Sequence, residues 1–427
     1  MSTPASPSYP WWLRLSRLLT PQRLSYAWVA GGGLWLAWLI SLILGPGNFD
    51  LAGQVIGTDY LQFYASGITL RQGQADRLYD FEYQAALEQQ IAGPGLSSFH
   101  AFITPPFLAW LFVPLSSLPY AWSFILWSGS SLVLLWVSLR FLGSARPGKT
   151  FLWSLCWYPV FTAVSFGQNS LLSLLLLSLT YRLWMRRQPF SAGLAASLVL
   201  FKPQLLLGVA ILWLVDWRKD WKALLGLLTG GGALLALTLA LMPEAASEYL
   251  SLAANFLPGL IYQEQFPLYH LHALRGFLIL LLPGMTSLVE IVALIASLAA
   301  VVIFVRIIRR TSPQPAIQYA AAISLTILIT PHAMIYDWAL LLIPAILFWQ
   351  NHPQLKLYWR SIFAILWVVT LLSSPLTYLQ QKALPVVLQV SVPIYILVLV
   401  SMVKMLTQHG SAPDRKSNAN PEPPNMQ

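Results

Sequence analysis

Three residues of this chain have side chains that could do chemistry, and each stands beside a strongly apolar segment. Asp59 lies in the stretch "VIGTDYLQFYASG", next to Tyr60 and close to Tyr64. Its carboxylate could act as a general base that takes a proton from an attacking hydroxyl group. Lys202 and His332 stand where other apolar segments are interrupted, and a lysine with a histidine suits a phosphate oxyanion. The residue types therefore favour a transfer reaction on a phosphate compound, with aromatic rings available to stack on a sugar.

Each of these residues also has a structural interpretation. Asp59 could cap the helix that follows it, as aspartate commonly does. Lys202 could extend its ammonium group to the membrane surface while its stem stays in lipid. His332 could be an interfacial histidine, with Asp337 as its partner or as a helix cap. Both interpretations stay open for each residue taken alone.

The composition identifies the surroundings of these residues as a membrane. Of the 427 residues, 57% are hydrophobic and only 9% are charged, whereas a soluble domain carries roughly 25% charged residues. Apolar runs long enough to cross a bilayer recur along the chain, and the 19 tryptophans and 17 tyrosines suit the membrane–water boundary. The net charge of +10 comes from clusters in short loops, which indicates cytoplasmic loops rather than a nucleic-acid partner. We therefore expect an all-α, polytopic integral membrane protein.

The basic clusters also predict the topology. Placing every cluster in the cytoplasm requires about twelve crossings with both chain ends inside. Residues 103–118, "ITPPFLAWLFVPLSSL", are apolar but contain several prolines, so we expect a re-entrant or surface-lying helix on the outer side. The predicted parts are a cytoplasmic segment (1–24), a transmembrane catalytic domain (25–407) with outer loops at 46–102 and 243–286, and a disordered cytoplasmic tail (408–427).

This topology places the candidate polar residues on one side of the membrane. An ionisable group facing lipid costs at least about 2.5–3.5 kcal/mol, so such groups persist where they line a cavity, as do interrupted helices. Gln168 and Asn169 could merely cap the next helix, but a shared outer site explains the whole set. Its apolar walls could hold an isoprenoid chain, which together with the polar groups favours glycosyl transfer from a lipid phosphate sugar. The set comprises Asp59, Gln168, Asn169, Lys202, Gln204, His332, Tyr336 and Asp337.

Metal and nucleotide sites have weak support in the sequence. The pair His270 and His272 is a poor metal signal without further ligands, and with His100 these histidines could be surface residues. No glycine-rich phosphate loop or nucleophile elbow is present. Cys156 is the single cysteine and lies inside an apolar run, so it cannot form an internal disulfide.

Five elements, in order over residues 59–345, resemble glycosyltransferase family 87. An aspartate followed by an aromatic residue opens "TDYLQFYASGITLRQGQADRLYD", and "ITPPFLAWLFVPLSSLP" stands where the family has a Y-P-P element. The remaining elements are "GQN" at 167–169, "KPQ" at 202–204 and "TPHAMIYDWALLLIP" from 330. The departures are Tyr60, where phenylalanine is commoner, and Thr104, where tyrosine is usual.

The resemblance implies a membrane enzyme with the GT-C fold that uses polyprenyl-phosphate sugars and inverts the anomeric carbon without an obligatory metal or cofactor. The transferred sugar would be a hexose or a pentose, with mannose the leading candidate, and the acceptor would be a lipid or glycan hydroxyl. The site would face the outer side of a bacterial plasma membrane. Asp59 would be the catalytic base. The implied donor-binding residues are Lys202, His332, Gln204, Gln168 and Asn169, with Tyr60, Tyr64, Tyr336 and Asp337 in support.

Two other classes fit part of the pattern. A lipid or sugar transporter would also combine polytopic helices with polar groups at membrane depth, although the internal inverted repeats common in transporters are not found. A ligase for lipid-linked glycans would be expected to carry a paired histidine or arginine signature in an outer loop, and none is clear. A transporter would expose its polar site to both sides of the membrane, whereas an enzyme would gather it at one face.

Overall fold

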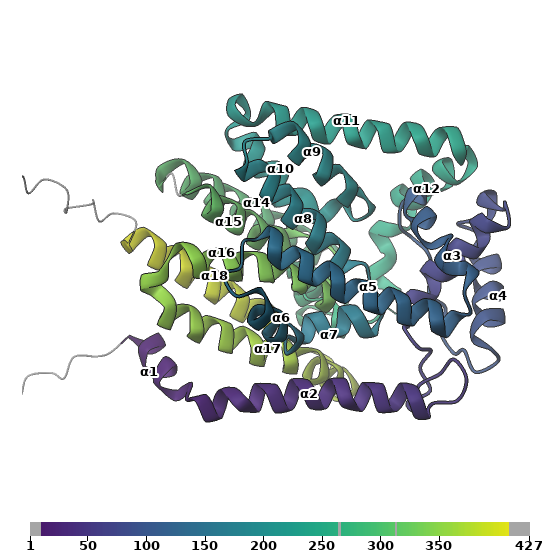
Figure 1. Ribbon diagram of the computed structural model, residues 1–427, viewed down its shortest axis with the longest axis horizontal. Helices are drawn as coiled ribbons and strands as arrows, with labels where there is room; N and C mark the ends of the chain where they lie inside the picture. The colour runs from purple at the N-terminus through teal and green to yellow at the C-terminus, as the bar shows by residue number, and fades with distance from the viewer. Residues whose placement is uncertain (1–9, 264–265, 312–313, 410–427) are drawn as a thin grey trace, which may run out of the picture.

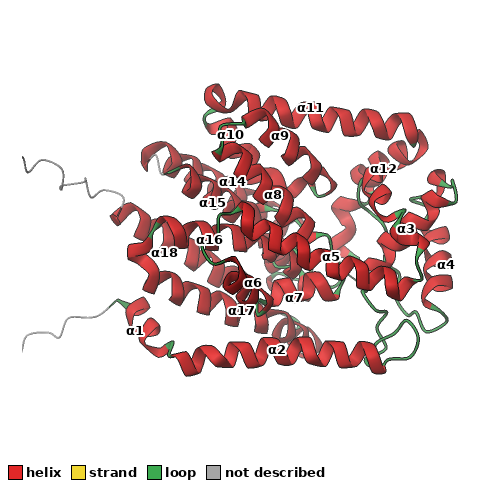
Figure 2. Ribbon diagram, viewed as in Figure 1, coloured by secondary structure: helices red, strands yellow, loops and turns green. Residues whose placement is uncertain are grey.

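The computed structural model describes residues 10–263, 266–311 and 314–409, and in these ranges the chain forms helices and loops without a strand (Figure 2). Two isolated bridges, Phe49 with Val55 and Leu271 with Met334, are the only β contacts among them. The expected all-α class is therefore confirmed for the described part of the chain. Residues 1–9 of the predicted N-terminal segment and 410–427 of the predicted tail lie outside the described residues.

The helices have the following bounds. The α-helices are α1 (Trp11–Leu18), α2 (Pro21–Leu44), α3 (Tyr60–Arg71), α4 (Phe81–Ala92), α5 (Tyr120–Phe141), α6 (Pro147–Leu155), α7 (Tyr158–Ser165), α8 (Ser170–Met185), α9 (Pro189–Ser197), α10 (Leu207–Val215), α11 (Trp217–Leu241), α12 (Pro243–Asn255), α13 (Leu274–Leu281), α14 (Thr286–Thr311), α15 (Pro315–Ile329), α16 (Leu342–Asn351), α17 (Lys356–Ala383) and α18 (Ser391–His409). The 3₁₀ helices are η1 (Ala75–Arg77), η2 (Pro106–Phe112), η3 (Leu115–Ser117), η4 (Leu198–Phe201), η5 (Pro203–Leu206), η6 (Leu257–Tyr262), η7 (Leu268–His270), η8 (Ile335–Leu341) and η9 (Pro353–Leu355).

Five described helices are long and apolar enough to cross a membrane, and a bent pair raises the number to six. The five are α2, α5, α11, α14 and α17 with η9, and the pair is α7 with α8, which meet at a bend of 120°. The predicted count of about twelve is therefore not confirmed. The other apolar segments, including α9–η4, η5–α10 and α15, are shorter helices that end at polar turns. Helices this short are tolerated at membrane depth where protein surrounds them.

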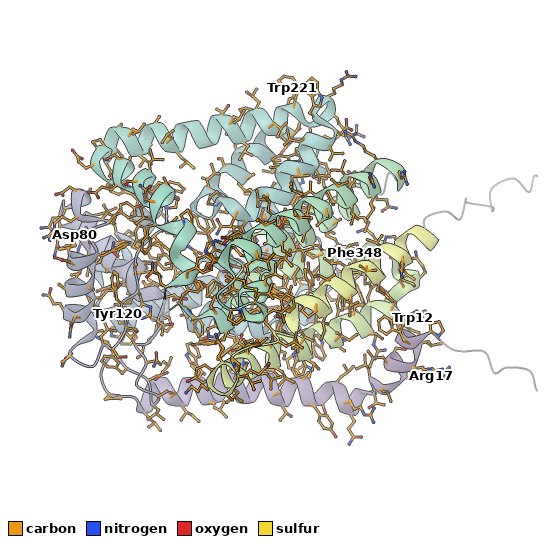
Figure 3. The ribbon with its side chains drawn as sticks, turned by 180° about the vertical axis from the view of Figure 1, so that it is seen from behind. Trp12, Arg17, Asp80, Tyr120, Trp221 and Phe348 are labelled. Carbon is orange, nitrogen blue, oxygen red and sulfur yellow. The ribbon has the colours of Figure 1, made fainter. Side chains whose placement is uncertain are left out.

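The long helices α2 and α11 run along opposite sides of the molecule (Figure 1). α2 presents large apolar side chains outward, among them Val29 and Ile43. Such continuous apolar exposure would be a liability in water and is expected in lipid. α3, α4 and α12 gather at the end of the molecule away from α1 and α18 (Figure 1). Seen from behind, Asp80 and Tyr120 likewise lie at the end opposite Trp12 and Arg17 (Figure 3).

The predicted outer loop 46–102 is largely folded. It contains α3, η1 and α4, and α4 begins where the Asp80 side chain accepts a hydrogen bond of 3.0 Å from the backbone N–H of Tyr83. Much of α3 is buried, so this segment is a part of the core rather than a solvated loop. Residues 243–286 similarly contain α12, η6, η7 and α13.

Residues 103–118 form η2 and η3 instead of one longer helix. Prolines at 105, 106 and 114 remove backbone donors and favour short 3₁₀ pieces. Both pieces pack on α3: the Tyr64 hydroxyl donates to the Leu118 carbonyl at 2.7 Å, and Gly67 lies directly against the backbone of Phe112. The segment is therefore not among the helices that are long and apolar enough to span a membrane, and its expected position on the outer side stays a prediction.

Candidate active site

The site begins at a tight turn between α7 and α8. Gly167 adopts a φ of +69°, a region that glycine enters without steric cost. The Phe166 carbonyl accepts hydrogen bonds of 3.0 Å from the backbone N–H groups of Asp59 and Tyr60, and the Trp127 indole donates to the Gly167 carbonyl at 2.9 Å. The start of α3 is thereby fixed on the turn, and Asp59 is held beside Gln168.

Asp59 occupies the N-cap position of α3, but its side chain makes no capping hydrogen bond. Its Oδ2 instead accepts a hydrogen bond of 2.8 Å from Gln168 Nε2, a residue 109 positions away in the sequence. The capping interpretation of Asp59 is therefore wrong. Asn169 at the N-cap of α8 likewise makes no side-chain cap.

A continuous polar network leads from Asp59 to a buried ion pair. Gln168 Oε1 accepts a hydrogen bond of 3.4 Å from Lys202 Nζ. Lys202 Nζ also lies 3.0 Å from Asp337 Oδ1 and 5.0 Å from the centre of the Tyr336 ring. Lys202 stands between η4 and η5, where Pro203 interrupts the helix. The ammonium group is therefore turned into the protein and does not extend to the membrane surface.

Asp337 anchors the far end of this network. Its Oδ1 also accepts a hydrogen bond of 2.7 Å from the Ser170 hydroxyl, and its Oδ2 accepts one of 3.3 Å from the Met334 N–H. The second bond lies at the start of η8, so the helix-cap interpretation holds for part of this carboxylate. Asp337 is only 2% exposed, whereas the Asp59 side chain is 23% exposed. Of the two, Asp59 is thus the more exposed carboxylate.

His100 belongs to the same site, and the surface position considered for it is wrong. Its Nδ1 lies 4.0 Å from Asp59 Oδ1, and its Nε2 shares a hydrogen bond of 3.0 Å with the Ser98 hydroxyl. Glu88 Oε2 accepts a hydrogen bond of 2.9 Å from the His100 backbone N–H. Nothing in the local sequence distinguishes His100 from a loop histidine. The only available signal was its position just before the "ITPP" element.

Burial controls the protonation of these loop groups. It raises the pKa of Asp59, while His100, the Gln168 hydrogen bond and Lys202 act in the opposite direction. Burial lowers the pKa of His100 and raises that of Glu88 to about 8. Asp59 consequently combines a raised pKa with partial exposure of its side chain, two properties that suit a general base near neutral pH.

Several predicted residues take positions outside this network. Tyr60 is wholly buried, with its hydroxyl hydrogen-bonded to Ser123, so it supports the fold and cannot stack on a sugar. Tyr64 is also buried. Asn169 is buried with both polar side-chain atoms lacking a partner among the described residues. Gln204 is partly exposed, and no contact joins its side chain to the network in the described ranges.

His332 lies in a neighbouring cavity with Arg275 and Glu290, and no hydrogen bond or ion pair joins it to Asp59 within the described residues. His272, also considered as a surface residue, is buried between the Ser374 and Ser391 hydroxyls. Residues 10–263, 266–311 and 314–409 contain no group of three or more histidine, cysteine or acidic side chains placed to hold a metal ion.

The turn at Gly167 generates the first prediction. A Cβ at this position would lie 2.5 Å from the Tyr60 Cβ, so Gly167→Ala should push α3 from the turn and lower both thermal stability and any activity of Asp59. Gly53→Ala is the matched control, because Gly53 also has a positive φ of +76° but open space around it. Thermal unfolding in detergent would compare them. If both variants lost the same thermal stability, backbone strain alone would explain the loss, and the contact with Tyr60 would not matter.

The Lys202–Asp337 pair generates the second prediction. Lys202→Met should destabilise the protein strongly, because removing one partner of a buried pair costs about 3–5 kcal/mol. The double variant Lys202→Met/Asp337→Asn should recover most of that loss, since the remaining amide can still bond with Ser170. Thermal unfolding of the two single variants and the double variant gives the interaction free energy between the two side chains. Additive losses would mean that the two charges do not depend on each other.

A family of known proteins matches more than half of this chain. The sequence model of glycosyltransferase family 87 matches residues 102–331. No curated protein and no solved structure shows a significant match to the chain. The matched segment includes Gln168, Asn169 and Lys202, while Asp59 precedes it and Asp337 follows it. Because this segment covers more than half of the sequence, the chain belongs to glycosyltransferase family 87 and is a membrane glycosyltransferase.

Proposed function

We propose that this protein transfers a sugar, with mannose the leading candidate, from a polyprenyl-phosphate donor to a hydroxyl group of a lipid or glycan. The observation that carries the proposal is the Asp59 carboxylate. It is partly exposed and is held by Gln168, at the end of a network that contains a buried lysine. Family membership supports the reaction class.

In the proposed reaction Asp59 takes the proton of the acceptor hydroxyl as the hydroxyl oxygen attacks the anomeric carbon. The bond from that carbon to the phosphate oxygen breaks, and polyprenyl phosphate leaves with the electron pair. A single displacement of this kind inverts the anomeric carbon and needs one base but no protein nucleophile. The hydrogen bond from Gln168 to Oδ2 fixes the carboxylate and leaves Oδ1 for the acceptor.

Lys202 supports this geometry in two ways. It holds Gln168 through Oε1 and so fixes the amide that holds Asp59. Its charge also favours the ionised form of Asp59. Asn169 and Gln204 remain proposed contacts for the sugar, since the described residues give their side chains no other hydrogen-bond partner.

We place the site on the outer side of a bacterial plasma membrane. The basic clusters of the short loops favour the cytoplasm for those loops. α1 and α18 gather at the end of the molecule away from α3 and α4 (Figure 1). Since α3 begins at Asp59, this arrangement supports an outer position for the base.

The third prediction tests the base. Asp59→Asn keeps the shape of the side chain and should lower turnover by about 10²–10⁴-fold without loss of folding. Purified protein in lipid would be given polyprenyl-phosphate sugars, and donor consumption followed by mass spectrometry. Asp80→Asn is the control, because asparagine caps α4 as well as aspartate does. Retention of more than about a tenth of the wild-type rate would remove Asp59 from this role.

The fourth prediction concerns pH. Asp59 must be ionised to act as a base, so activity is present above its pKa and is lost as pH falls through it. Because burial raises this pKa, the acid limb of kcat/KM should lie above the ordinary value for aspartate, about 3.9. Gln168→Leu removes a hydrogen bond that favours the ionised form, so the limb should move to higher pH. If the acid limb of the Gln168→Leu variant lay at the same pH as that of the wild type, Asp59 would not be the group that controls it.

A further inference from the structure

A second polar site lies in a cavity of about 480 Å³ bounded by α12, η6, α13, α14 and the end of α15. One part of its wall is apolar and includes Leu257, Leu274, Leu294 and Ile329. The other part carries polar side chains. These are Arg275, Glu290, Ser297, Thr330 and His332. The cavity is therefore amphipathic, and its volume is of the size that small-molecule sites have.

Arg275 is the cation of this cavity. Its Nε donates to Glu290 Oε1 at 2.8 Å, and its Nη2 contacts the same oxygen and the Pro258 carbonyl. The Tyr262 hydroxyl also donates to Glu290 Oε1. A guanidinium group has five donors, and within the described ranges no partner is recorded for the Nη1 group. Arg275 can therefore donate to an anion in the cavity and still keep its contact with the Pro258 carbonyl when Glu290 is displaced.

Two more polar groups in the wall lack partners. His332 Nε2 and Thr330 Oγ1 are buried, and neither has a hydrogen bond within the described residues. Unpaired buried polar atoms are uncommon in folded proteins. Both residues line the cavity, so a ligand there could pair with these atoms if the side chains rotate toward it. Burial, with Arg275 nearby, lowers the pKa of His332 to about 4. A neutral imidazole, a hydroxyl and a guanidinium can all donate hydrogen bonds, and phosphate oxygens can accept from each.

The apolar wall indicates the rest of the ligand. Leu294 lines the cavity and is itself 60% exposed on α14. α14 is one of the helices able to span a membrane, and Ile291 and Leu298 on it are also exposed. The cavity is thus continuous with an apolar face that lipid would cover. A lipid whose phosphate enters the cavity could keep its chain against α14.

We propose that this cavity binds the phosphate and the first isoprenoid units of a polyprenyl phosphate, with Arg275 as the main phosphate ligand and Glu290 as the counter-ion that the phosphate displaces. The proposal rests on the proposed function and locates the donor lipid of that reaction. Arg275 suits this role better than Lys202. Glu290 is 41% exposed and can return to water, whereas Asp337, the partner of Lys202, is 2% exposed and cannot.

The cavity connects with the Asp59 network through one segment. Residues 330–332 line the cavity, and Asp337 further along the same segment holds Lys202. Leu271, in the loop before α13, forms a bridge with Met334 in the middle of this segment. A phosphate in the cavity and a base at Asp59 would therefore be fixed relative to each other by residues 330–337.

The test measures binding of sugar-free polyprenyl phosphate and of uncharged polyprenol to purified full-length protein, by native mass spectrometry. Arg275→Gln should weaken polyprenyl phosphate binding at least tenfold. Glu290→Gln should strengthen it several-fold, because the phosphate no longer competes with a carboxylate. Polyprenol binding should change little in either variant. Arg77→Gln is the matched control, since Arg77 also pairs with a carboxylate, Asp80, and lies over a tyrosine ring.

Weaker binding in Glu290→Gln, or unchanged binding in Arg275→Gln, would overturn the proposal. The Glu290 variant keeps the test decisive if Arg275→Gln does not fold, because a gain in affinity cannot come from misfolding. Asp59-dependent transfer with an unchanged donor KM in Arg275→Gln would sink this inference and leave the proposed function standing. Lipid binding that depends on Arg275, in a protein that transfers no sugar, would instead overturn the proposed function and leave the lipid-binding cavity standing.

Discussion

The buried ion pair of Lys202 and Asp337 is the interaction on which the candidate active site depends. A charge buried without its partner is strongly destabilising, so each of these two residues requires the other. The pair also joins segments 135 positions apart in the sequence. Gln168 takes its orientation from Lys202, and Asp59 takes its orientation from Gln168. The position of Asp59, the proposed base, is thus a consequence of how the charges of Lys202 and Asp337 are neutralised.

Interrupted helices make this arrangement possible. The turn at Gly167, the break at Pro203 and the segment before η8 each release the chain from regular α-helix. In a membrane protein such irregular backbone is tolerated where protein or a cavity surrounds it. The released groups are then used: the Phe166 carbonyl holds the first residues of α3, and the Met334 N–H bonds to Asp337. The breaks that shorten the apolar helices therefore also build the site.

The three acids around the site differ in burial and in hydrogen-bond partners, and so in the roles that they can take. Asp337 is neutralised by Lys202 and is closed to substrate. Glu88 supports the His100 backbone, and burial raises its pKa to about 8. Asp59 alone among these three combines side-chain exposure with a hydrogen bond that favours its ionised form. This division is compatible with the single base of the proposed displacement.

The sequence by itself determined the properties that depend on local composition and pattern. Apolar runs, basic loops and prolines predicted an all-helical membrane chain, and the ordered motifs predicted its family. The predicted topology also placed eight polar residues, among them Asp59, Lys202 and His332, on one side of the membrane. Only the tertiary structure decided which of these residues contact one another. In the structure His332 lines the cavity of Arg275, Tyr60 is buried in the core, and His100 lies beside Asp59. These outcomes depend on packing between residues far apart in the chain, as in the bond from Gln168 to Asp59 across 109 positions, and no local pattern records such contacts.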